Sequence, residues 1–516
     1  MIRPPAPSAR QMILVIAQLA IVFSGYVWSQ TRTRKESAPA NHVLLGRQFE
    51  KKKQWAEAER EFRIAMQQDR NSAEAAIGHA EALAQVGQPF DAELELQSFL
   101  RDHPNVARAH ELYSVFAITL SDDFVLGESE MEKCVKLAPN NGMAWKSLGD
   151  IYLDHATPED AIAAYTKAAR LIPGNPLIVV ALADAYGQQG DDRRAEQTFA
   201  HAIKMASAAP ESPEAKGNKA GVQYLYGRYL LDRNRAKEAL TAINQALQFN
   251  PRSAAALYLR ARCYQAMEDF NRAEADALQA FALSPRDKQG PLLLVGIYRK
   301  LQDGDKAEQY AELAQKLVDQ EQQNASFARD VRRLLGIAEA ALREGRYPEA
   351  ISPYEDLIKK VPTFYEAYFG LGMCYSQTGR LADAEAAFRK YLSMQKLSGD
   401  GDAMLGIVLL QEGRGEEAAA ELQDAIAIDP SLDEARKALA TLYRQESKDD
   451  ESLRVLREAK DTKDAQLIAM MADILLQKGD LAGARRELAR AAALQPHDAD
   501  VLRVKQRIMA QRAASK

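Results

Sequence analysis

The sequence predicts an all-α solenoid, a superhelix of about thirteen helix–turn–helix units that follows a short apolar segment at the N-terminus. Two observations favour this fold. The chain has 516 residues, too many for one ordinary globular core, which indicates several domains or a repeat array. One small residue also recurs after each expected turn, and the interval between successive positions is nearly constant. These positions are Ala58, Ala92, Gly127, Ala161, Ala195, Ala239, Ala273, Ala307, Ala350, Ala384, Ala418, Ser452 and Ala484.

The N-terminal segment 1–29 contains an apolar stretch at residues 12–28. This stretch is at the lower limit of length for a membrane-spanning helix, and it is slightly longer than the apolar core of a signal peptide needs to be. Two arginines precede it, as a targeting segment requires. We therefore expect an uncleaved membrane anchor with the repeats in the periplasm, or alternatively a signal peptide cleaved near Ser29. A buried or disordered tail is the third interpretation. Residues 30–38 are expected to form a polar linker.

The clearest repeat unit is residues 142–175. In its first helix, four residues at helical spacing share one face, and in its second helix three residues precede a closing proline. They are Trp145, Leu148, Gly149 and Tyr152, followed by Ala161, Tyr165, Ala168 and Pro173. This pattern resembles the tetratricopeptide repeat, whose signature is W-x2-L-G-x2-Y, then A-x3-F and a closing proline. The resemblance extends from residue 39 to about residue 496, and it implies helix pairs that bury their apolar faces only by stacking on neighbours.

Two longer intervals interrupt the period, one between Ala195 and Ala239 and the other between Ala307 and Ala350. We expect an inserted loop at residues 207–219 and a polar helix extension at residues 315–330. These insertions divide the array into units 1–5, 6–8 and 9–13. The corresponding ranges are 39–206, 220–314 and 331–496, with an amphipathic capping helix at 497–516.

Composition and motifs exclude several function classes. Residues 40–516 carry 62 basic and 71 acidic side chains, a net charge of −9, which argues against nucleic acid as a partner. No catalytic, nucleotide-binding or zinc motif is present, so we expect no catalytic residue, no metal and no cofactor. The three cysteines lie far apart, and Gly399–Asp402 lacks the later ligands of a calcium loop. The cysteines and the seven scattered histidines are Cys134, Cys263, Cys374, His42, His79, His103, His110, His155, His201 and His497.

In the tetratricopeptide family, ligands usually lie in the concave groove that the first helix of each pair lines. Here two consecutive units place a tyrosine and an arginine one helical turn apart on one face, as Tyr224 with Arg228 and Tyr258 with Arg262. Tyr and Arg are enriched at binding hot spots, so this ladder predicts a docking patch for a peptide or helix. The alternative is that each Tyr packs on its neighbour and each Arg is solvated. Further candidates towards the same side are Arg299 and Phe369.

The resemblance therefore implies a non-enzymatic scaffold that binds other proteins or peptides. It also implies a role in envelope assembly, secretion or polymer export. A self-assembling structural protein that forms homo-oligomers is the alternative, favoured if residues 501–509 present an apolar patch.

Overall fold

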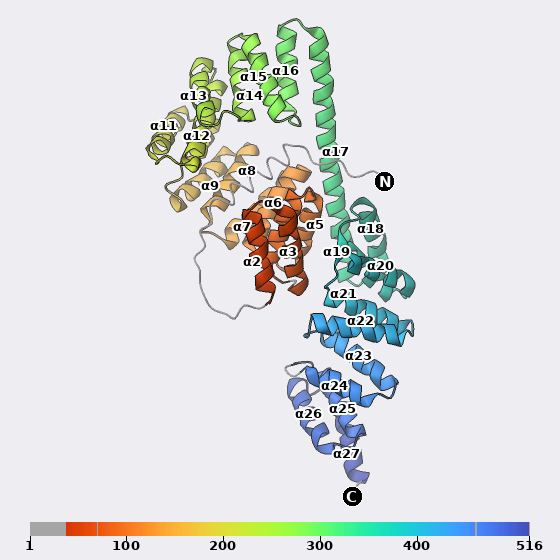
Figure 1. Ribbon diagram of the computed structural model, residues 1–516. Helices are drawn as coiled ribbons and strands as arrows, with labels where there is room; N and C mark the ends of the chain where they lie inside the picture. The colour runs from red at the N-terminus through yellow and green to blue at the C-terminus, as the bar shows by residue number, and fades with distance from the viewer. Residues whose placement is uncertain (1–37, 70, 460–461, 515–516) are drawn as a thin grey trace. The chain divides into compact units, whose positions relative to one another are not determined.

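The computed structural model describes residues 38–69, 71–459 and 462–514, and the regular secondary structure of this part consists of 26 α-helices with no strand (Figure 1). The apolar stretch 12–28 and residues 30–37 of the expected linker lie outside the described residues. Among the helices that are described, none has both the length and the apolar character needed to cross a bilayer.

The first seven helix pairs follow the expected repeat, with one first helix and one second helix in each. Their bounds are α2 Ala38–Lys51 and α3 Trp55–Gln68, α4 Ala73–Gln85 and α5 Pro89–Asp102, α6 Ala107–Ser121 and α7 Phe124–Leu137, α8 Gly142–Asp154 and α9 Pro158–Leu171, α10 Pro176–Gln189 and α11 Asp192–Ala208, α12 Pro213–Asp232 and α13 Ala236–Phe249, and α14 Ala254–Ala266 and α15 Phe270–Leu283.

The later helices follow the same order with one exception, α17. They are α16 Gln289–Lys300, α17 Gly304–Arg343, α18 Tyr347–Lys360, α19 Tyr365–Gln377, α20 Leu381–Met394, α21 Gly399–Gln411, α22 Gly415–Ile428, α23 Asp433–Gln445, α24 Asp449–Glu458, α25 Ala465–Gln477, α26 Leu481–Leu494 and α27 Ala499–Ala514. α17 joins the second helix of the eighth pair to the first helix of the ninth without a turn.

The fourth pair shows why the signature residues form this motif. α8 begins after Asn141, whose side-chain oxygen accepts hydrogen bonds from the backbone N–H groups of Met143 at 3.1 Å and Ala144 at 3.2 Å. A Cβ added to Gly149 would lie 2.6 Å from the Tyr165 ring of α9. Only a residue without a side chain permits this separation, so the small residue sets how closely the two helices approach.

The predicted inserted loop at 207–219 is wrong. α11 continues to Ala208, and α12 begins at Pro213, so that only residues 209–212 connect the two helices. Ser212 caps α12 by accepting a hydrogen bond from the Ala215 N–H at 3.0 Å, and the following proline suits the first helical position.

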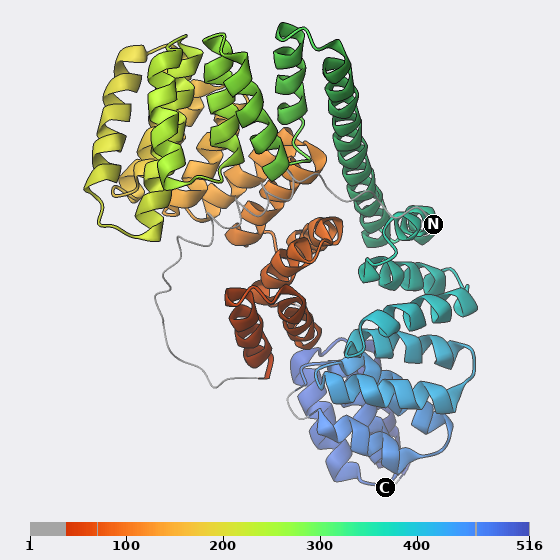
Figure 2. The ribbon, with the colours of Figure 1, turned by 45° about the horizontal axis from the view of Figure 1, so that its top comes forward.

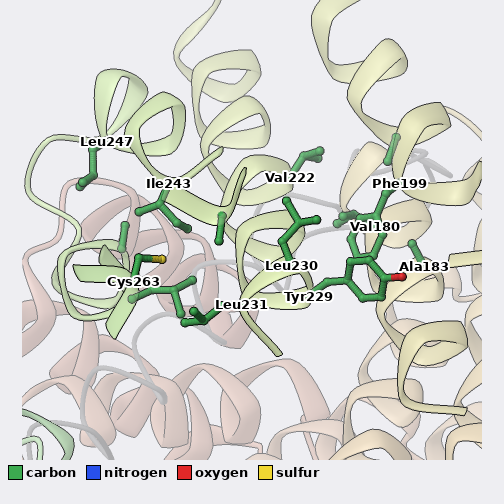
Figure 3. Packing of buried hydrophobic residues seen from close by; sticks show 14 of the residues in the cluster. Val180, Ala183, Phe199, Val222, Tyr229, Leu230, Leu231, Ile243, Leu247 and Cys263 are labelled. Carbon is green, nitrogen blue, oxygen red and sulfur yellow. The ribbon is translucent and has the colours of Figure 1, made fainter. Parts of the chain in front are cut away.

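The core is continuous across this connection. Phe199 of α11 and Val180 of α10 belong to the same buried cluster as Val222 and Leu230 of α12 and Ile243 of α13 (Figure 3). The fifth and sixth pairs therefore pack as ordinary neighbours, and the insertion does not separate two blocks.

The chain forms two compact units, and the division falls inside α17. The first unit contains residues 45–60 and 73–332, and the second combines residues 38–44 and 61–72 with the chain from residue 333 onward. The stretch 315–330 lies inside α17, as expected for a helix extension (Figure 2). α17 has 40 residues and contains no proline, so no helix-breaking proline ends it between the second helix of one pair and the first helix of the next.

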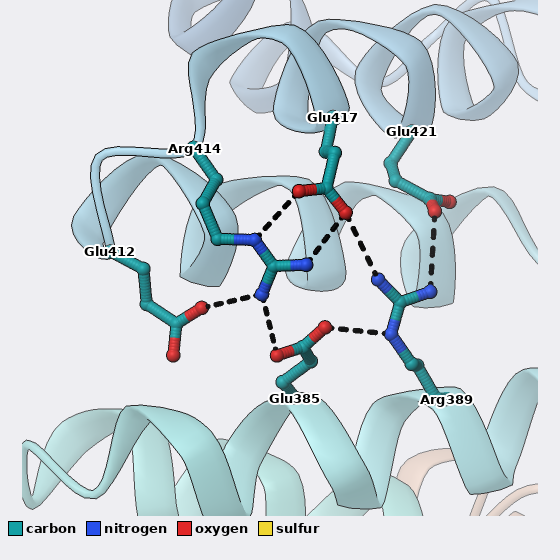
Figure 4. Close-up of polar contacts among 6 residues, drawn as sticks. All are labelled: Glu385, Arg389, Glu412, Arg414, Glu417 and Glu421. Atoms are coloured by element: carbon teal, nitrogen blue, oxygen red, sulfur yellow. Dashed lines mark hydrogen bonds and ion pairs between the residues drawn. The ribbon is translucent and has the colours of Figure 1, made fainter.

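The second unit shows the same pairing from α18 to α26. Arg389 of α20 and Arg414, just before α22, join these helices through four glutamates (Figure 4). α27 buries Val501, Val504 and Ile508 in a cluster with α25 and α26, so it caps the array. On its outer face Leu502 and Met509 are exposed.

Candidate binding groove

Tyr224 and Tyr258 lie on α12 and α14, the first helices of consecutive pairs. Both rings are half-buried and pack against the core cluster of the first unit. Burial raises the pKa of Tyr258; Arg262 opposes this rise, while Asp287 and Tyr224 add to it. Because both rings pack against the same buried cluster, the structure places the two tyrosines of the predicted ladder on one core.

Arg228 is already engaged within the protein. Its Nη2 lies 2.5 Å from the Asp184 carboxylate on α10, and Gln188 donates a second hydrogen bond to that carboxylate at 3.3 Å. Asp184 is buried, and burial raises its pKa although Arg228 opposes the rise. Because a buried carboxylate needs its counterion, Arg228 is held in place and does not supply an uncommitted cation.

Arg262 and Arg299 are more available. The Arg262 guanidinium is 3.9 Å from Asp232, beyond hydrogen-bond distance, and its side chain is 40% exposed. Arg299 is exposed at the end of α16, and its side chain makes no hydrogen bond and no ion pair with any residue that the structure describes. The neighbouring Lys300 is likewise exposed. The two candidate arginines that are not held by a buried carboxylate therefore lie on α14 and α16.

The sequence reasoning missed Leu292. It stands one repeat period after Tyr258, just as Tyr258 stands one repeat period after Tyr224, so all three occupy the same register. Leu292 is 53% exposed, so it adds apolar area to this face. The following turn carries Gly296, where an added Cβ would meet only the Gln265 amide nitrogen at 3.2 Å. The repeat period itself was the signal that could have identified Leu292.

Phe369 lies on α19. It belongs to the second unit, and its ring centroid lies 5.7 Å from that of Phe388 and 5.1 Å from that of Tyr391. The ring thus packs among aromatic neighbours in its own unit. That Phe369 lies towards the same side as the tyrosines and arginines of the first unit stays a prediction.

Elsewhere on the same face, polar residues pair with each other. The Lys146 amine lies 2.5 Å from the Asp150 carboxylate, as the i,i+4 spacing predicts, and Tyr165 donates to the other oxygen of Asp150 at 2.7 Å.

The three cysteines are buried, and burial raises the pKa of each thiol, to about 12 for Cys134 and about 11 for Cys263 and Cys374. Within the described chain, no group of His, Cys, Asp or Glu has the geometry to hold a metal ion.

Comparison with protein families matches the same repeat units. A tetratricopeptide-repeat family matches residues 128–176, 224–266 and 335–401, and a second tetratricopeptide-repeat family matches residues 178–208 and 254–287. The chain therefore contains tetratricopeptide repeats at these residues. Proteins with such repeats are interaction scaffolds and are generally not enzymes.

Among curated proteins, this repeat-containing chain is similar to the TPR repeat-containing protein YpiA of Bacillus subtilis, with 24% identity over 131 residues. That match covers 25% of this chain and 31% of YpiA, so the chain spans about a third of its relative. The MamA crystal structure is 19% identical over 34% of this chain and 98% of that one, with a TM-score of 0.30. The human IFIT1 dimer with PPP-AAAA is 16% identical over 82% of this chain and 95% of the IFIT1 chain, with a TM-score of 0.41.

Proposed function

We propose that the first unit of this repeat-containing chain binds an extended segment of a partner protein. The segment would lie along Tyr224, Tyr258 and Leu292, and one of its carboxylates would meet Arg262 and Arg299. The observation that supports this most directly is the contrast between the arginines. Arg228 is paired with buried Asp184, whereas Arg262 is 40% exposed and its guanidinium has no hydrogen-bonded partner among the described residues.

The residue types suit this task. Tyr, with few rotatable bonds, loses little conformational entropy on binding, and an Arg fork can hold a carboxylate through two parallel hydrogen bonds. Leu292 adds apolar area that is exposed before binding. A segment with an apolar side chain one or two positions from an acidic residue fits this surface.

A random peptide library displayed on phage, selected on the full chain, tests the proposal. We expect enriched peptides to contain Asp or Glu beside an apolar residue. They should bind a variant with Arg262→Gln and Arg299→Gln at least tenfold more weakly. Lys237→Gln is the matched control, because Lys237 is an exposed cation on α13, a second helix. The proposal is contradicted if the peptides bind the parent, the double variant and the Lys237→Gln control equally, or if the selection enriches no peptide.

The cellular setting belongs to the same proposal. Its support is the apolar stretch 12–28 with two preceding arginines, and we infer a non-enzymatic scaffold anchored in the membrane with its repeats in the periplasm. The alternative is a secreted or periplasmic form cleaved near Ser29. By family resemblance, envelope assembly, secretion or polymer export is the proposed process. Mass spectrometry of the mature protein distinguishes the two forms, since an anchored chain keeps residues 1–29 and a cleaved one begins near Ser29.

A second candidate function is self-assembly through the C-terminal cap. Leu502 and Met509 are 38% and 59% exposed on α27. If this face joins two copies, analytical ultracentrifugation of the full chain should show a dimer that Met509→Glu and Leu502→Glu dissociate.

A further inference from the structure

One end of α17 contacts helix pairs that are distant in sequence. In a solenoid, each repeat contacts only its neighbours. Arg332 nevertheless donates from Nη1 to the Glu93 carboxylate on α5 at 2.8 Å, across 239 residues of sequence. It also donates to the Ser121 hydroxyl at 3.1 Å and to the Asp123 carboxylate. The first unit therefore contains a contact between its last helix and its second and third pairs.

Three further contacts surround Arg332. Arg329 donates to the backbone carbonyl of Ser121 at 2.9 Å, and the Gln97 amide donates to the carbonyl of Arg332 at 3.3 Å. Closer to the start of α17, the Phe327 ring meets the Phe90 ring edge-on, with the centroids 5.0 Å apart. The contact thus combines a buried ion pair, several hydrogen bonds and one aromatic pair.

The other end of α17 packs as the second helix of the eighth pair. Tyr310 stacks on Tyr298 of α16 with the ring centroids 5.5 Å apart, and Lys306 lies 3.8 Å from Glu274 of α15. From Lys306 to Arg332 an α-helix rises about 39 Å, at about 1.5 Å per residue. Because the helix is unbroken, it fixes the separation between these two contact points.

We propose that α17 is a clasp, which closes the first unit by docking its Arg332 end on the second and third helix pairs. The docked clasp, and not neighbour stacking alone, then sets the curvature of this unit. Curvature in a solenoid otherwise accumulates from small rotations between repeats, so one long-range contact restrains it strongly.

The docked state depends on the polar groups at the contact. Glu93 is fully buried, and burial raises its pKa while Arg332 opposes the rise. The second carboxylate oxygen of Glu93 and the amide oxygen of Gln97 are buried without a hydrogen-bond partner in the described structure. Undocking returns these groups and the Arg332 guanidinium to water. Undocking hydrates the unpartnered oxygens but breaks the hydrogen bonds of the Arg332 guanidinium, so these guanidinium contacts hold the docked state against the cost of burial.

Pulsed electron spin resonance on the full chain tests the clasp. Spin labels would be placed at Val125→Cys on α7 and Ser326→Cys on α17, both of which are exposed. The three native cysteines are buried, so labelling favours the introduced sites. We expect one short distance in the parent, and a second, longer distance carrying at least a third of the population in Arg332→Met. Lys316→Met is the control, since Lys316 is an exposed cation on the same helix.

Arg332→Met leaves Glu93 buried without its counterion, which can impair folding. The double variant Glu93→Gln with Arg332→Met removes the buried charge as well. We expect it to keep the parent's helical circular dichroism and to populate the longer distance, since the guanidinium contacts are absent. The proposal is overturned if this folded double variant shows only the short distance, or if Lys316→Met opens the clasp to the same extent.

Discussion

His79 and Glu95 form a buried ion pair between α4 and α5. The His79 Nδ1 lies 2.8 Å from one Glu95 oxygen, and the opposite ring nitrogen lies 3.2 Å from Glu59 of α3. Burial alone would lower the pKa of His79, but Glu95 and Glu59 outweigh burial and raise it to about 9. His79 is therefore held as an imidazolium at neutral pH.

The ion pair between His79 and Glu95 makes the stability of the second helix pair depend on pH. Because the folded-state pKa of about 9 exceeds the ordinary value of 6.5, the stabilisation is fully present below pH 6.5 and is lost as the pH rises through 9. We expect the free energy of opening of α4 and α5 to fall by about 3 kcal/mol over this window. Native-state hydrogen exchange of the full chain measures it. In His79→Gln the fall should be absent, and a parent profile that is flat from pH 6.5 to 9 would contradict the assignment.

We expect a separate pH dependence of stability in the second unit, and it arises from Asp402. It is buried in the first turn of α21, and its carboxylate makes no hydrogen bond or ion pair with any described residue. Burial, followed by the neighbouring Glu421 and Asp424, raises the pKa of its carboxyl to about 7 from 3.8. The folded state therefore binds the proton more tightly than the unfolded state, and stability falls as the pH rises from about 4 to about 7.

Asp402→Asn should relieve this penalty. At pH 8 we expect α21 and α22 to become more stable to local opening by about 1–3 kcal/mol, with no gain at pH 4. Hydrogen exchange of these two helices provides the measurement, and Glu416→Gln, at an exposed position of α22, is the control. Equal protection of parent and Asp402→Asn at pH 8 would show that the carboxylate is solvated.

The close approach in the fourth pair gives a prediction about packing. An added Cβ at Gly149 would lie 2.6 Å from the Tyr165 ring, whereas at Gly174 it would meet nothing within 4 Å. We expect Gly149→Ala to destabilise the protein by about 1–3 kcal/mol and Gly174→Ala to change stability by less than about 0.5 kcal/mol. Denaturant unfolding of the two variants gives the comparison. A Gly149→Ala protein as stable as the parent would mean that the helices can separate at no cost.

The same comparison explains why helix pairs are predictable from this sequence. Close helix contact needs a small residue, as at Gly149, and a small residue recurs in the second helix of each unit from Ala58 to Ala484, so the period is visible without a structure. Long-range contacts leave no such pattern. Nothing near Glu93 or Arg332 in the sequence indicates their ion pair, because the pairing depends on curvature that accumulates over the helix pairs between them.

The candidate groove was only partly predictable for related reasons. The register aligns Tyr224 with Tyr258 on consecutive first helices, but it does not show whether a cation is already paired. Asp184 on α10 and Arg228 on α12 stand at the same register position of consecutive first helices. Their opposite charges were therefore a signal in the sequence that they form an ion pair. Phe369 has the same register as the tyrosines, yet register carries no information about which compact unit a helix joins.

Arg228 and Arg262 should contribute differently to the stability of the folded protein. Arg228→Gln leaves Asp184, whose side chain is only 7% exposed, without its counterion. We expect this variant to lose about 2–4 kcal/mol of stability at pH 7, because a buried carboxylate without a partner is costly. Arg262→Gln removes an exposed guanidinium that is 3.9 Å from Asp232, so it should change stability by less than about 0.5 kcal/mol. Denaturant unfolding at pH 7 measures both values. If the two variants are equally stable, the Arg228–Asp184 pair does not form in solution, and Arg228 must be counted with Arg262 as a cation available to a ligand.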